Sequence, residues 1–255
     1  MENFKYNKMK RYLKQLLSPA LIVQLKVLFR YAKLLANGRF FKLVTLENSN
    51  SMGEFHLQIT EKQAIKHGEY FENKLNNIRL TASKLSGLII PQGAIFSFWH
   101  LVGNPSERNG FQKSRIIRNG KVNFEVGGGV CQVSGLVYLA ALKAGLTILE
   151  RHNHSVDIYA EDERISPLGA DATVVYGSKD LQFINDSNGA IQLIVNVLNT
   201  HEIILTLSKT HPSEAIVLTF ERAERANERI VKTIGELNGI KTELAVSVYK
   251  ITFCK

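Results

Sequence analysis

The spacing of apolar residues near the start of the chain is helical. Between residues 12 and 35, apolar side chains recur at steps of three and four positions, with basic residues between them: Leu13, Leu16, Leu17, Leu21, Leu25, Leu28 and Phe29. This spacing predicts an amphipathic helix. Pro19 is expected to start a new helix there, because proline is tolerated in a first turn. A second pattern of this kind predicts a helix over residues 61–88, which Gly87 interrupts.

Short apolar runs between turn residues predict strands in much of the remaining chain. Residues 88–102 hold two such runs, separated by a turn at Pro91 and Gly93. Residues 114–124 predict a hairpin, because the Asn119-Gly120 pair suits a tight two-residue turn. Four more β-rich segments, with Gly, Asn, Asp and Ser between them, predict an antiparallel sheet. These segments are residues 172–176, 181–184, 191–198 and 202–207.

The chain of 255 residues is expected to fold as one α+β domain with an extension at each end. Residues 1–47 are interpreted as a basic amphipathic helical extension. Residues 48–208 are expected to form the α+β domain, in which mixed helices pack on an antiparallel sheet. Residues 209–255 are interpreted as an appendage with a helix near 221–237 and a strand near 244–253.

The net charge of +9 lies at one end of the chain. Residues 1–44 hold ten Lys or Arg against Glu2 alone, and the other residues are neutral in sum. We expect these basic helices to contact an anionic membrane surface, or else to pack on the body of the protein, and we expect no nucleic-acid partner. No run approaches the roughly 20 apolar residues of a spanning helix. With only two cysteines, the chain is expected to be cytoplasmic, either free or peripheral at the inner membrane face.

The glycines Gly127–Gly129 come just before Cys131. Ordering glycine is costly, so such a run indicates close backbone approach or positive φ. The apolar residues 131–143 predict a buried helix that Cys131 opens and that stops at Gly145. A thiol at a helix N-terminus meets the positive end of the helix dipole, which favours the nucleophilic thiolate. Free N–H groups there would also receive an oxyanion.

Two histidines and a carboxylate follow this helix. Residues 147–159 are interpreted as a strand, whose alternation puts His152 and His154 on one side, so one of them is expected to face Cys131. Asp171, at the start of the next strand, would orient that imidazole. The alternative is zinc held by these four side chains. Their spacing matches no zinc signature and the sequence has no CxxC or HExxH, so we expect neither a metal nor another cofactor.

Three stretches resemble the VanW family, which is named for an accessory protein of some glycopeptide-resistance clusters: GGGVCQVSGLVYLAAL, ERHNHSV and GADATVVYGSKDLQFIND. The resemblance extends upstream to IIPQGAIFSFWHLVGN and covers about residues 75–207. It implies a connection with glycopeptide (vancomycin) resistance and with the cell envelope or peptidoglycan. It also favours His154 over His152 as the base. By analogy of pattern, the order of Cys, helix, His and Asp is similar to transglutaminase-like and papain-like thiol enzymes.

We therefore expect a thiol-dependent acyl-transfer or amide-cleaving enzyme that acts on a peptide-like, envelope-related substrate. Cys131 is the candidate nucleophile, His154 the base and Asp171 the residue that orients the base. The substrate and anion pocket is expected to include Gly127, Gly128, Gly129, Gln132, Ser134 and His152. The alternative function is a non-catalytic, envelope-associated binding or accessory protein. Such a protein would hold a peptide or peptidoglycan fragment in the groove beside the glycines and would need no thiolate.

Overall fold

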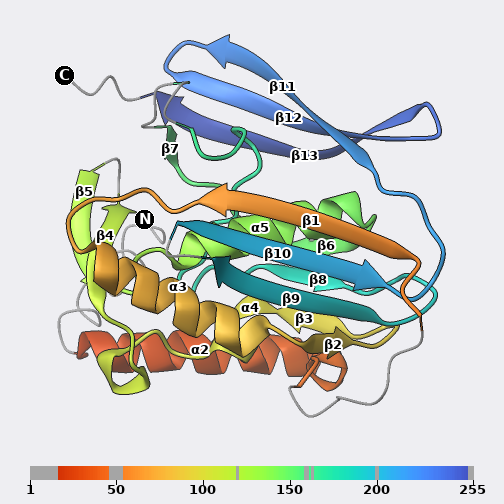
Figure 1. The fold of residues 1–255 in the computed structure, drawn as a ribbon. Helices are drawn as coiled ribbons and strands as arrows, with labels where there is room; N and C mark the ends of the chain where they lie inside the picture. Colours follow the sequence, from red (N-terminus) through yellow and green to blue (C-terminus); the bar gives the residue numbers. More distant parts are fainter. Residues whose placement is uncertain are drawn as a thin grey trace, which may run out of the picture.

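The structure is a computed structural model that describes residues 17–45, 54–118, 121–157, 161, 164–198 and 201–251. Its helices are α2 (Pro19–Ala36), α3 (Phe71–Leu85), α4 (Phe98–Val102) and α5 (Val130–Lys143), with 3-10 turns η1 (Phe40–Lys42) and η2 (Glu107–Asn109). These helices combine with antiparallel sheets, so the α+β class is confirmed (Figure 1). No helix within the described ranges is long and apolar enough to cross a membrane.

One sheet is covered by helices and has four antiparallel strands in the order β1-β10-β9-β2. They are β1 (Leu57–Ala64), β10 (Glu202–Lys209), β9 (Ile191–Leu198) and β2 (Leu88–Ile90). Burial alternates along β9 and along most of β10, as expected for strands with one face on a core. Helices α3 and α5 contact this sheet and cover that face (Figure 1). The strands predicted at 191–198 and 202–207 are therefore confirmed.

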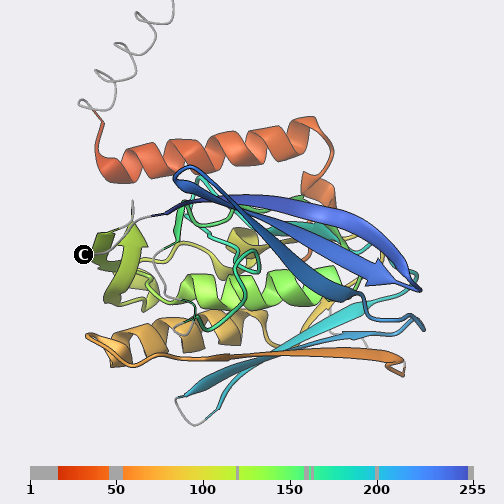
Figure 2. The same cartoon turned by 90° about the horizontal axis from the view of Figure 1, so that it is seen from above.

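Helix α5 lies at the centre of the core. Eleven of its fourteen residues are buried, including Tyr138 and every residue from Val133 to Leu142. A helix that is apolar on all sides must be enclosed by other elements. Figure 2 shows α5 in the middle of the molecule, with α2 on one outer side and β1 toward the other. The helix is followed by Gly145 at φ +72°, a conformation that suits the residue after a helix end.

Two smaller sheets complete the region around α5. One has the order β3-β8-β6, from β3 (Ile95–Ser97), β8 (Gln182–Ile184) and β6 (Thr147–Glu150). The other is the hairpin of β4 (Lys113–Arg118) and β5 (Lys121–Val126), in which Arg118 is opposite Lys121. The predicted hairpin is thus confirmed, although Asn119-Gly120 lies outside the described residues.

The C-terminal segment is a sheet and not a helix followed by a strand. Its order is β11-β12-β13-β7, from β11 (Val217–Arg225), β12 (Glu228–Leu237), β13 (Ile240–Ile251) and β7 (Val156–Asp157). The helix predicted near 221–237 is wrong, because β11 and β12 form an antiparallel hairpin there. Val231 of β12 is fully buried against Leu168 and Tyr249. These contacts join residues that are far apart in the sequence and favour a hairpin. The local pattern of charges does not reveal them.

Three other elements differ from the predictions. Residues 61–64 belong to β1, so the helix predicted over 61–88 is shorter and begins at Phe71. No strand forms over residues 172–176, where Val175 makes only an isolated bridge to Lys179. The strand predicted over 147–159 is interrupted between β6 and β7. This interruption matters, because it contains both histidines of the candidate site.

Helix α2 begins as predicted, with Pro19 in its first turn and Ser18 as its N-cap. The preceding residues of the predicted basic extension, 1–16, lie outside the described part of the chain. Val44, which follows η1, is buried in the main core. Leu218 and Leu244 of the C-terminal sheet pack against that same core. The division at residues 47 and 208 stays a prediction.

Candidate functional site

The three glycines fix the start of α5 by close packing. Gly127 and Gly129 have φ angles of +91° and +96°, which L side chains rarely adopt. A Cβ atom on Gly128 would lie 2.3 Å from Ser114 Oγ, so there is no room for a side chain. The buried Asn77 side chain on α3 donates to the Gly128 carbonyl at 3.0 Å. The loop is thereby held against α3 and β4, and it presents Cys131 as the second residue of α5.

Cys131 is a partly buried residue, and its thiol has polar neighbours from the segment after Asp171. Its Sγ atom lies 3.8 Å from Thr173 Oγ1 and 3.8 Å from the Val174 carbonyl oxygen. The His154 imidazole also lies near enough to the thiol to lower its pKa. Cys131 as a whole residue is intermediate in exposure, which is less enclosed than the apolar residues that follow it in α5.

Asp171 fixes the position and tautomer of His154. Its Oδ2 atom accepts the His154 backbone N–H at 2.7 Å and contacts His154 Nδ1 at 2.6 Å. With the Nδ1 proton directed to the carboxylate, Nε2 is the ring nitrogen left for the thiol. The structure thus brings Cys131, His154 and Asp171 together in the predicted order.

The electrostatics of this group favour a thiolate beside an imidazolium. Burial alone would raise the pKa of the Cys131 thiol, but the hydrogen bond and charge of His154 bring that pKa below its usual value. Burial alone would lower the pKa of His154, whereas Asp171 and Cys131 raise it to about 10. Burial opposes ionisation of Asp171, yet His154 and Arg151 lower the pKa of its carboxyl to about 2. Each charged group therefore stabilises the next.

Arg151 holds Asp171 from the side away from His154. Its guanidinium donates to Asp171 Oδ1 at 3.1 Å, to the Asp171 carbonyl at 2.7 Å and to the Gly169 carbonyl at 2.9 Å. It also lies over the Tyr138 ring, 4.8 Å from the ring centre. Sequence reasoning missed this residue, although Arg151 stands inside the quoted ERHNHSV stretch. Its position next to the two histidines in the sequence was the signal that could have identified it.

The C-terminal sheet contributes two more side chains from β13. The Tyr249 hydroxyl donates to Asp171 Oδ1 and accepts the Gly169 N–H at 3.0 Å. The pKa of Tyr249 is raised, first by burial and then by the charge of Asp171. Ser247 Oγ accepts a hydrogen bond from Arg151 at 2.6 Å. Nothing in the sequence connects Tyr249 or Ser247 with Asp171, because the contact depends on how the sheet packs.

The other predicted pocket residues take different places. His152 turns to Glu150, with 3.0 Å between Nε2 and Oε1. Ser134 is fully buried, and its hydroxyl donates to the Ala172 carbonyl at 2.6 Å, which ties α5 to the Asp171 segment. The Gln132 amide donates to the Ala64 carbonyl of β1 at 3.2 Å. Among the described residues, no group of three His, Cys, Asp or Glu side chains could hold a metal ion.

Comparison with known proteins gives two curated relatives. The chain is 37% identical over 128 residues to the vancomycin B-type resistance protein VanW of Enterococcus faecalis, covering 50% of this chain and 46% of the relative. It is 31% identical over 186 residues to the uncharacterized protein YoaR of Bacillus subtilis, covering 71% of this chain and 58% of the relative. The chain thus spans about half the length of these relatives. No solved structure matches the chain.

The family described as VanW like protein matches residues 73–207. This range is more than half of the 255 residues. It contains Cys131, His154, Asp171 and Arg151 but ends before β11, so Tyr249 lies outside it. From the match and the two relatives, we conclude that the chain belongs to the VanW-like protein family.

Proposed function

We propose that the protein is a thiol-dependent enzyme that transfers or hydrolyses acyl groups of a peptide-like substrate from the cell envelope. The observation that carries the proposal is the 2.6 Å contact between Asp171 Oδ2 and His154 Nδ1, together with the effect of His154 on the Cys131 thiol, whose pKa it lowers. A nucleophile, a base and a residue that orients the base, each in reach of the next, are the parts that covalent acyl transfer needs.

In the proposed reaction, the Cys131 thiolate attacks the carbonyl carbon of an amide. The C–N bond then breaks, and His154 Nε2 gives its proton to the leaving amine, which produces a thioester on Cys131. Water or an acceptor amine attacks the thioester and returns a proton to His154, and Cys131 leaves as the thiolate. Water gives hydrolysis, and an amine gives acyl transfer.

The start of α5 is suited to the negative charge that develops on the carbonyl oxygen. Cys131 is the second residue of this helix, whose first turn carries the positive end of the helix dipole. Backbone N–H groups in such a turn stabilise an oxyanion without reorganisation. Glycines at φ +91° and +96° let the preceding loop pack closely on its neighbours where it enters this turn.

The proposed substrate is a peptide of peptidoglycan. One relative is named as a vancomycin B-type resistance protein, and we propose a role in that kind of resistance for this chain as well. Peptidoglycan peptides supply amide bonds of the kind that a Cys-His pair cleaves or transfers. Cys131, His154 and Asp171 lie within residues 73–207, the range that matches the family.

Purified peptidoglycan stem peptides provide the test. Acid-quenched mixtures are expected to contain a covalent adduct on Cys131 by intact-mass and peptide mass spectrometry, together with cleaved or transferred peptide. Cys131→Ala should abolish the adduct and lower turnover by at least about 10³-fold, because no nucleophile remains. Ser178→Ala, a change at an exposed hydroxyl, serves as the matched control and should behave as wild type.

Two results would contradict this proposal. The peptides could bind wild type and Cys131→Ala with equal affinity and give no adduct or product. That outcome would show that the protein binds these peptides without catalysis. If neither form bound or processed the peptides, the proposed substrate class would be wrong.

A further inference from the structure

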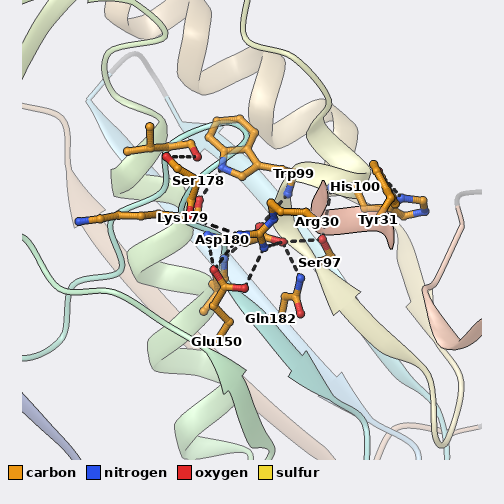
Figure 3. A network of polar contacts seen from close by, with 12 residues as sticks. Arg30, Tyr31, Ser97, Trp99, His100, Glu150, Ser178, Lys179, Asp180 and Gln182 are labelled. Carbon is orange, nitrogen blue, oxygen red and sulfur yellow. Dashed lines mark hydrogen bonds and ion pairs between the residues drawn. The ribbon is translucent and has the colours of Figure 1, made fainter. Parts of the chain in front are cut away.

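Helix α2 has an inner face that is attached to the body of the protein by polar contacts (Figure 3). Arg30 donates to both carboxylate oxygens of Glu150, at 2.8 and 3.1 Å, and lies 3.4 Å from Asp180. The Tyr31 hydroxyl is 3.0 Å from Nδ1 of His100 on α4. Figure 3 shows Arg30 directed at Glu150 and Asp180, with Trp99 and Ser97 around them. These contacts fix which face of α2 is turned outward.

The outer face of α2 is apolar and exposed. It consists of Leu21, Leu25, Leu28, Phe29 and Leu35, which follow the three- and four-residue steps of one helix face. Leu28 is 66% exposed and Phe29 is 73% exposed, and no residue of α2 is buried. Just beyond the helix, Phe41 is exposed as well. A contiguous apolar surface of this kind marks an interaction site more often than a plain solvated surface.

Cations accompany this outer face and no acidic residue does. Lys26 and Lys33 are exposed on the same helix, and Lys42 is exposed on η1 beside Phe41. Residues 19–42 contain neither Asp nor Glu. A second copy of the chain would bring these like charges together, which disfavours pairing through this face. An anionic lipid surface instead satisfies both properties, because its headgroups attract the lysines and its acyl boundary accepts the leucines.

We propose that α2 is an interfacial helix, which docks the protein on an anionic membrane with its outer face in the headgroup and acyl boundary. The Arg30 contacts keep the body of the protein on the solvent side of the helix. Figure 2 shows α2 along an outer side of the molecule, where a flat surface can reach it. This proposal is independent of the chemistry assigned to Cys131.

Flotation of the full chain with vesicles tests the docking surface. The protein is expected to float with vesicles of phosphatidylcholine and phosphatidylglycerol and to float less with phosphatidylcholine alone. A double variant, Leu28→Gln with Phe29→Gln, should lower partitioning at least about tenfold, because two apolar side chains no longer enter the acyl boundary. Lys26→Glu with Lys33→Glu should weaken binding to the anionic vesicles and remove most of its salt dependence.

Val217→Gln with Ile240→Gln is the matched control. These side chains are 65% and 71% exposed on the C-terminal sheet, so the change in polarity is comparable but lies away from α2. The control should partition as wild type, and each variant should keep the wild-type melting temperature. Equal flotation of the Leu28 and Phe29 variant and wild type would overturn the proposal. The proposal would also be overturned if the wild type were a dimer that does not bind vesicles and the Leu28 and Phe29 variant were a monomer. The outer face would then join two copies of the chain.

Discussion

At mildly acidic pH, Cys131 of a His154→Ala protein is expected to react with iodoacetamide about tenfold more slowly than Cys131 of the wild type, or slower still. The imidazolium lowers the pKa of the thiol, and without it burial raises that pKa. Each unit of thiol pKa changes the thiolate fraction about tenfold at a pH below both values. The higher nucleophilicity of a more basic thiolate offsets only part of this loss. Peptide mass spectrometry measures the rate at Cys131 itself.

The pH dependence has a defined sign. The advantage of wild type over His154→Ala should be largest at acidic pH, where the lower pKa of the paired thiol gives it the larger thiolate fraction. It should shrink as the pH rises and disappear near the pKa of His154, about 10, because the imidazolium then loses its proton. Asp171→Asn should slow the reaction through the imidazole and add little in the double variant with His154→Ala.

His152→Ala is the matched control for this prediction. The His152 imidazole faces Glu150, so its removal should leave the reactivity of Cys131 nearly unchanged. Equal rates for wild type and His154→Ala across the pH range would show that His154 does not ionise the thiol. A larger effect of His152→Ala than of His154→Ala would assign the role to the other histidine.

Replacement of Arg151 by Met is expected to lower the free energy of unfolding by about 3–5 kcal/mol, the usual cost of breaking a buried ion pair. The side chain of Arg151 is only 7% exposed, and its loss leaves the Asp171 and Gly169 carbonyls without their donor. It also leaves the Asp171 carboxylate with fewer partners. Urea unfolding at neutral pH measures this difference. Cys131 alkylation should slow as well, because His154 is then less firmly oriented.

The pH of that experiment matters because Asp171 is itself titratable. Its pKa in the folded protein is lowered to about 2, so its contribution to stability is present above the pKa of an unfolded Asp and is lost as the pH falls through the folded value. Arg222→Met, which breaks an exposed pair with Glu161, is the control and should change stability by less than about 1 kcal/mol. A loss of less than about 1 kcal/mol in Arg151→Met would mean that Arg151 does not support the site.

Much of the region around Cys131 could be read from local sequence. Strands β9 and β10 show the alternation that a sheet with one buried face imposes, and the Asn119-Gly120 pair in the sequence is typical of the hairpin that β4 and β5 form. The glycines before Cys131 reflect two positive φ angles and a site with no room for a Cβ atom. Each of these signals lies within a few residues of the structure that it predicts.

The remaining parts depend on contacts between distant segments. In the structure, β11 and β12 form a hairpin over the charged stretch 221–237, and Val231 is buried against Tyr249. No strand forms at 172–176, where Thr173 and Val174 instead contact the Cys131 thiol. Tyr249 reaches Asp171 from 78 residues away. Sequence reasoning predicted the contact between His154 and Asp171 but not the side chains that hold Asp171 in place.

A pH titration of the thiolate tests the central claim most directly. The ultraviolet absorbance of wild type minus that of Cys131→Ser isolates the signal of this one thiolate, since Cys254 is present in both proteins. The proposed Cys131, His154 and Asp171 group predicts a midpoint below that of an ordinary thiol, which moves upward in His154→Ala. A midpoint at or above the ordinary value in wild type, unmoved by His154→Ala, would contradict it.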